Sequence, residues 1–137
     1  MSDFNLSIQQ GIAAAKIAIE NRNQVKSIFE EINSAISTES NGNARLEIID
    51  SIQAMDGIEY LKGILDKKSS GQLLVIRNTK TKSFKKIAEW RQNESGYPCS
   101  IIRGTRHTSC ADADSLRLEL SDLLTSPIVG EAILETK

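Results

Sequence analysis

The sequence contains few of the residues that cross-link or interrupt a small fold. Its 137 residues include two cysteines, two prolines, one histidine and one tryptophan, and aromatic residues make up 4%. Two cysteines do not form a disulfide framework, and a chain of this length can bury one hydrophobic core without cross-links. The hydrophobic fraction of 39% argues against disorder. We therefore expect one folded domain over residues 1–137.

No apolar stretch is long enough for a membrane span, and none follows a basic N-terminal region. Residues 12–19 are rich in alanine and isoleucine, but Lys16 interrupts them. A spanning helix needs about 20 apolar residues, and a secretory signal has a basic region before its apolar one. We therefore expect a cytoplasmic protein with reduced thiols and no membrane association.

The charge is nearly balanced in total and uneven along the chain. The formal net charge is −1. Residues 67–107 carry ten basic and two acidic side chains, whereas residues 1–66 carry five basic and ten acidic ones and residues 108–137 carry two basic and six acidic ones. The total therefore hides a basic middle segment between two acidic ends.

The N-terminal third has the pattern of a long helix. Residues 6–37 contain no proline and repeat apolar residues at helical spacing, in one stripe from Ile8 to Ile19 and a second from Val25 to Ile36. The two stripes are out of register, and the change falls at residues 21–23. Either the helix breaks there or one continuous helix contacts different partners along its length.

A continuous helix of this length is longer than a globule of 137 residues is wide. It measures about 45 Å, whereas the radius of gyration of such a globule is about 14 Å. We therefore expect a homo-oligomer with an interface on this helix. The residues expected at the interface are Ile8, Ile12, Ile19, Val25, Phe29 and Ile32.

The chain then changes from helical to strand-like patterns. Residues 37–43 are rich in serine, asparagine and glycine and predict a loop, and residues 46–65 fit helical turns, although residues 45–49 alone also suit a short strand. Residues 72–78 form a compact run of leucine, valine and isoleucine that predicts a buried strand. Residues 82–92 suit either type, and we favour a strand with Phe84, Ala88 and Trp90 on one face.

A hairpin and two helices complete the predicted fold. Pairing across Gly104 and Thr105 matches Arg103 with Arg106 and sets Cys99 opposite Cys110. Asp112 is placed to cap a helix over residues 113–124, and Pro127 to open a last short one. We expect an α+β fold: a helical part over residues 1–67, an antiparallel meander of three to four strands over residues 72–110, and closing helices over residues 112–135.

The residues that most often carry chemistry are sparse and widely spaced. Cys99, His107 and Cys110 lack the paired spacing of a zinc site, and the hairpin register separates His107 from both thiols unless the strand bends. The sequence also has no glycine-rich phosphate loop, HExxH or GxSxG motif. We expect buried cysteines, a surface histidine, and neither a metal nor a cofactor. An enzyme that uses the Cys/His residues remains an alternative.

The basic middle segment suggests contact with an anionic partner. Cations beside exposed aromatic rings on a sheet can hold nucleic acid or a nucleotide-like ligand. The competing interpretations are that the rings face the core and that the acidic helices neutralise the cations. The residues expected to contact an anionic partner are Arg77, Lys82, Lys86, Arg91, Arg103 and Arg106.

These patterns lead to one functional hypothesis with two alternatives. We expect a non-catalytic, small cytoplasmic binding or regulatory protein, of the inhibitor, immunity or accessory type, that acts through a macromolecular partner, in the first place a protein. Nucleic-acid or nucleotide-ligand binding through residues 67–107 is the first alternative, and an enzyme is the second.

Overall fold

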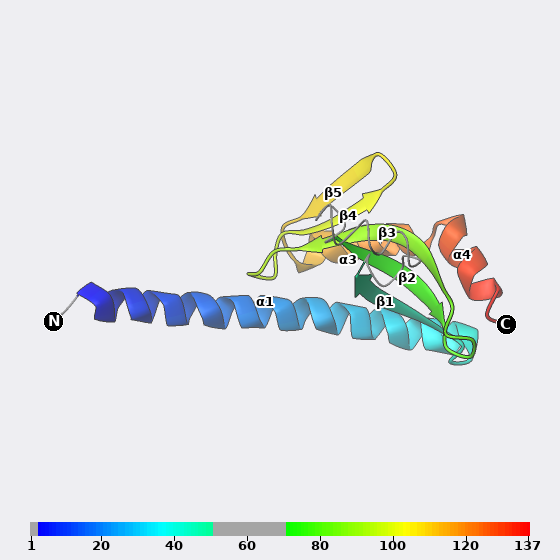
Figure 1. Cartoon of the computed structure of the whole chain (residues 1–137), viewed down its shortest axis with the longest axis horizontal. Helices are drawn as coiled ribbons and strands as arrows, with labels where there is room; N and C mark the ends of the chain where they lie inside the picture. Colours follow the sequence, from blue (N-terminus) through cyan, green and yellow to red (C-terminus); the bar gives the residue numbers. More distant parts are fainter. Residues whose placement is uncertain (1–2, 51–70) are drawn as a thin grey trace, which may run out of the picture.

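A five-stranded antiparallel sheet carries helices on one face and a long helix that extends beyond it (Figure 1). The computed structural model describes residues 3–50 and 71–137. The elements in chain order are α1 (Asp3–Ser40), β1 (Ala44–Asp50), β2 (Gln72–Asn78), β3 (Phe84–Gln92), β4 (Cys99–Arg103), β5 (Arg106–Cys110), α3 (Ala113–Leu124) and α4 (Pro127–Leu134). This confirms the predicted α+β fold with a long first helix, a meander and closing helices.

The sheet has one strand more than the upper number predicted. Its spatial order, β1-β2-β3-β4-β5, follows the sequence. The additional strand is β1, which the sequence assigned to the helical part, so that prediction is wrong for residues 44–50. Leu46 and Ile48 of β1 pair with Ile76 and Leu74 of β2, and this tertiary pairing outweighs a local pattern that fits both periods. The rest of the predicted helical part, residues 51–67, lies outside the described residues.

The long helix is continuous through the change of register and ends later than predicted. It runs to Ser40, whereas residues 37–43 were predicted as a loop. The Ser40 hydroxyl donates to the Ile36 carbonyl at 2.7 Å and accepts from the Ala44 N–H at 3.1 Å. This hydroxyl satisfies polar groups at the helix end, and Asn41 and Gly42, both at positive φ, then turn the chain into β1.

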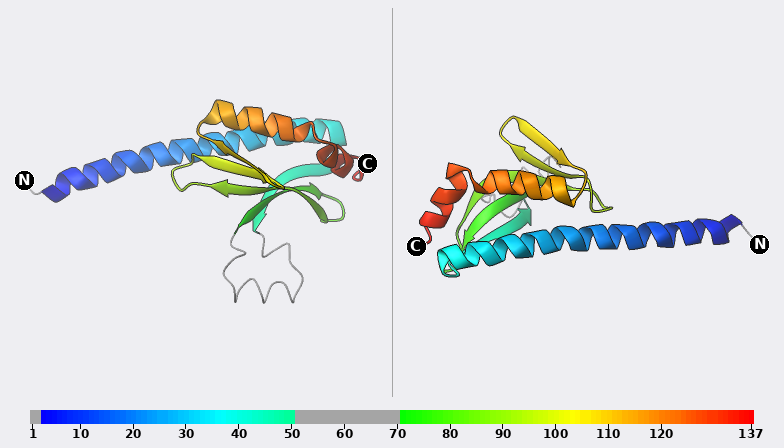
Figure 2. Two further views of the ribbon diagram at one scale, coloured as in Figure 1. Left: turned by 90° about the horizontal axis from the view of Figure 1, so that it is seen from above. Right: turned by 180° about the vertical axis from the view of Figure 1, so that it is seen from behind.

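The C-terminal half of α1 packs on the sheet beside α3, as both views of Figure 2 show. Val25, Ile28 and Phe29 are buried, and the Phe29 ring meets Trp90 of β3 edge to face, with 5.3 Å between the ring centroids. Such aromatic contacts stabilise a core by about 0.5–1.5 kcal/mol beyond the area they bury. None of the described helices is long and apolar enough to cross a membrane.

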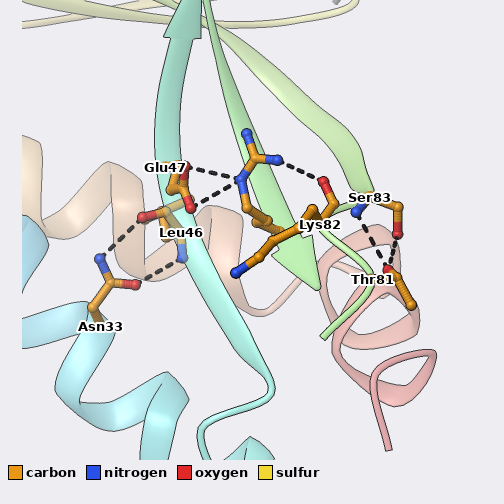
Figure 3. A network of polar contacts seen from close by, with 7 residues as sticks. Asn33, Leu46, Glu47, Thr81, Lys82 and Ser83 are labelled. Atoms are coloured by element: carbon orange, nitrogen blue, oxygen red, sulfur yellow. Dashed lines mark hydrogen bonds and ion pairs between the residues drawn. The ribbon is translucent and has the colours of Figure 1, made fainter. Parts of the chain in front are cut away.

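Asn33 of α1 covers the free edge of the sheet at β1 (Figure 3). Its side-chain amide donates to the Leu46 carbonyl at 3.0 Å and accepts from the Leu46 N–H at 2.7 Å. These are the two backbone groups that a further strand would bond. The helix therefore occupies part of an edge with which no other strand among the described residues pairs.

The hairpin and the closing helices form as predicted. Arg103 pairs with Arg106 and Cys99 with Cys110. The Asp112 carboxylate accepts from the Ser115 N–H at 2.8 Å, which caps α3 and holds the pKa of Asp112 below its ordinary value. Pro127 opens α4 at its first turn.

The loop between β3 and β4 fixes the point at which α1 leaves the domain. Gly96 has φ +95°, and a Cβ there would collide with the Cβ of Asn21 and lie 2.9 Å from the Arg22 nitrogen. The Asn21 side chain donates to the Ser95 carbonyl at 3.1 Å, and the Tyr97 hydroxyl donates to Gln24 at 2.8 Å. The loop and the helix backbone can approach so closely only because residue 96 has no side chain.

We expect Gly96→Ala to destabilise the fold, because it combines strain at positive φ with a clash against helix backbone. The expected loss in free energy of unfolding is about 1–3 kcal/mol, measured by chemical denaturation. Gly130→Ala in α4 is the control, since a Cβ there meets nothing within 4 Å, and we expect it to be neutral or stabilising. Equal stability of the two variants would contradict this role of Gly96.

Candidate interaction surfaces

The six cations predicted to contact an anionic partner do not form one surface. Arg77, Lys86 and Arg91 lie on the face of the sheet opposite the helices, because they alternate with core residues on β2 and β3. Arg103 and Arg106 face α3, and Lys82 lies in the turn between β2 and β3. The six cations are therefore distributed over both faces of the sheet and one turn.

Acidic neighbours pair with most of these cations. Arg77 contacts Glu47 at 3.0 Å and donates to the Lys82 carbonyl at 2.6 Å (Figure 3). Lys86 lies 3.5 Å from Glu89. At the hairpin, Arg103 and Arg106 share two carboxylates of α3, Glu119 and Asp122, at 2.7–3.6 Å. The acidic helix α3 thus neutralises the basic hairpin, as one of the competing interpretations had it.

Two aromatic rings of the basic segment, Trp90 and Phe84, do not share one face of the sheet. Trp90 is 1% exposed and packs against Phe29. Phe84 was expected on the same face as Trp90, but a register shift at Leu74 and Val75 sends it to the opposite face. There it lies under the Arg77 guanidinium, 5.3 Å from it. The stacking surface that the alternation suggested is therefore not formed by these two rings.

The thiols and the histidine also lie apart. Cys99 and Cys110 are fully buried, and the Cys99 Sγ donates to the Gly96 carbonyl at 3.1 Å. His107 is exposed and pairs with Ile102, so it lies on the other face of the sheet. Burial raises the pKa of the Cys99 thiol to about 12. The structure thus places the cysteines in the core, as expected, and does not bring His107 to them.

An apolar groove lies on the helical side of the molecule, where α1, α3 and α4 meet. Its volume is about 460 Å³. Its apolar lining residues are Ile28, Ile32, Ala35, Ile36, Leu124, Val129 and Ile133. Sequence reasoning missed it because these residues are far apart in the chain and their spacing predicts only helix faces.

Two of the four polar residues of the groove are acidic. Glu31 and Glu39 of α1 border it, and Arg117 of α3 lies 2.8 Å from Glu31. Arg117 and Ser121 are its remaining polar members. Since Arg117 is paired with Glu31, Glu39 gives the groove an excess of negative charge.

The N-terminal half of α1 projects away from the sheet as an arm, defined here as residues 3–20 (Figure 1). Its side chains are exposed apart from a half-buried Ala18. Six large apolar residues of the arm are 48–77% exposed. They are Phe4, Leu6, Ile8, Ile12, Ile17 and Ile19.

The structure divides the predicted oligomer interface into two groups. Ile8, Ile12 and Ile19 are exposed on the arm. Val25 and Phe29 are buried against the sheet of the same chain, and Ile32 is half-buried and lines the groove. Only the first group is therefore open to a second molecule in the way the sequence predicted.

We expect the two thiols of the native protein to be unreactive toward Ellman's reagent at mildly alkaline pH and to react after unfolding. The raised pKa of Cys99 keeps it protonated, and both side chains are out of reach of solvent. Since the folded pKa lies above the ordinary 9.0, this thiol stabilises the fold below that pH and loses its contribution as the pH rises toward 12. Rapid reaction of a native thiol would contradict this assignment.

Comparison of the chain with models of known protein families, with curated protein sequences and with solved structures finds no match.

Proposed function

We propose that this is a non-catalytic binding protein that holds an apolar, basic-flanked segment of a protein partner in the groove between α1, α3 and α4. The observation that carries the proposal is the groove itself, at about 460 Å³ and with seven apolar lining residues. Binding clefts commonly have volumes of about 300–1,000 Å³ and apolar walls with a few polar groups. A helix-bordered groove of this kind suits an amphipathic segment of a partner.

The charge of the helical layer favours a basic partner over an anionic one. Helices α1, α3 and α4 carry nine acidic and four basic side chains within their bounds. Glu31 and Glu39 lie at the groove itself. Lysine or arginine beside the apolar residues of a partner would meet Glu39, since Glu31 is already paired with Arg117, and electrostatic attraction of this kind raises the association rate and selects the partner.

We infer a regulatory role, because a segment bound in the groove would be withheld from other partners. A bound segment is covered by α1, α3 and α4 and is unavailable to other partners, which is the action of an inhibitor, immunity or accessory protein. The proposal places the protein in the cytoplasm, because its two cysteines are buried free thiols and suit a reducing compartment.

The test is a display selection of random peptides on the full chain, followed by binding measurements with the selected peptides. We expect amphipathic peptides with lysine or arginine beside their apolar residues. Ala35→Arg should weaken their binding by about tenfold or more, because the new side chain occupies the groove and removes about 1.4 kcal/mol or more of binding free energy.

Ser34→Arg is the matched control, since residue 34 is exposed on the same helix but does not line the groove. It introduces the same side chain and charge one residue away and should leave binding unchanged. Selection of no peptide, or of peptides whose affinity is equal for both variants, would overturn the proposed function.

A further inference from the structure

Four of the six exposed large apolar residues of the arm lie on one side of the helix with Ala15 and form a seam, whereas Leu6 and Ile17 lie on the opposite side. The seam residues are Phe4, Ile8, Ile12, Ala15 and Ile19. At about 100° per residue they fall within about 80° of the helix circumference. A stripe this narrow is typical of helix–helix pairing, whereas a helix that covers a domain core has a wider one.

The seam does not serve the chain's own domain. Ile28 and Ala35, two of the residues of α1 that line the groove, point to the opposite side of the helix. Phe4, Ile8 and Ile12 are 77%, 59% and 52% exposed. Between residues 4 and 19 the only charged residue is Lys16. An apolar patch of this kind on an exposed helix marks an interaction site.

The charges of the arm argue against a membrane surface as the occupant. Helices that bind the lipid interface carry lysine and arginine along their polar face. The arm has one lysine and two acidic residues, Asp3 and Glu20. Its flanks are otherwise uncharged, with Asn5 and Gln9 on one side and Ser7, Gly11 and Ala18 on the other. An uncharged flank of this kind suits another helix.

The next residues on the seam side determine the direction of pairing. Arg22 and Lys26 continue the line of the seam toward the C-terminus. In a parallel pair each would face its own copy, and like charges in contact are destabilising. In an antiparallel pair centred between Ile12 and Ala15, Arg22 lies opposite Asn5 of the second copy and Lys26 lies beyond its Asp3, so neither cation meets its own copy.

We propose that two copies of the chain pair through their arms as antiparallel helices. In this register Ile8 packs on Ile19 of the second copy, and Ile12 packs on Ala15 of the second copy. Lys16 lies beside Gln9 of the second copy, so no like charges are opposed along the seam. The loop between β3 and β4 contacts α1 from Asn21 to Gln24, and Asn33 and β1 occupy the helix further on, so the second helix pairs along the arm as far as this loop.

Light scattering coupled to size-exclusion chromatography tests the pairing with the full chain. We expect a mass of twice 15.1 kDa for the unaltered protein. Ile12→Lys and Ala15→Lys should each give the mass of a single chain, because a lysine ammonium would be buried in the seam. Both residues are exposed in the single chain and far from its core, so the variants should retain a cooperative unfolding transition.

Ile17→Lys is the matched control. Residue 17 is 58% exposed, close to the 52% of Ile12, but lies on the opposite side of the arm. It makes the same chemical change on the same helix and should leave the dimer intact. The unaltered chain at single-chain mass at every concentration would overturn the proposal, as would equal dissociation by Ile12→Lys and Ile17→Lys.

Disulfide trapping tests the direction. We expect a covalent dimer when chains with Ile8→Cys and Ile19→Cys are mixed and oxidised, and none from either variant alone, because residue 8 of each copy is displaced by about 16 Å along the helix axis from residue 8 of the other. The buried native cysteines do not interfere. Cross-linking of each variant alone would overturn the antiparallel register. A monomer that sediments with phosphatidylglycerol vesicles through Ile12 would replace the second copy with a lipid surface.

Discussion

The contact between Phe29 and Trp90 attaches the long helix to the sheet, and the groove and the arm both depend on this attachment. Trp90 lies on the central strand β3 and Phe29 on the C-terminal half of α1, so their edge-to-face packing holds the helix across the sheet. Asn33 adds two hydrogen bonds to the free edge at β1, one turn further along the helix. This half of α1 forms one wall of the groove, and its orientation sets the direction in which the arm projects.

The hairpin and the helix caps were predictable because their determinants are local. A Gly-Thr turn sets the register that brings Cys99 opposite Cys110, and Asp112 precedes the first turn of α3. The strand β1 was not predictable in the same way. Its apolar residues fit a helix as well as a strand, and its partner β2 follows only after residues 51–70. The pairing of β1 with β2, which is distant in sequence, determines that these residues form a strand.

The interaction surfaces were likewise predictable only where their determinants are local in the sequence. Exposure of Ile8, Ile12 and Ile19 agrees with the sequence argument, which used the apolar stripe and the length of the helix. Burial of Val25 and Phe29 in the chain's own core depends on a sheet whose position the helix pattern does not contain. The basic cluster was misleading for a related reason, because Glu47 and Glu119, which neutralise Arg77 and Arg103, come from β1 and α3, outside the basic segment. The groove requires three helices and is visible only once they are assembled.

The absence of a break in α1 couples the orientation of the arm to that of the groove. Since both lie on one continuous helix, the angle between the seam and the groove is set by the number of residues between them, at about 100° for each. One residue added or removed near residues 21–24 would turn the arm by that angle while leaving its composition unchanged. The number of residues between the seam and the groove therefore determines on which side of the molecule the seam lies relative to the groove. The length of α1, as well as its apolar residues, specifies from which side a second molecule can approach.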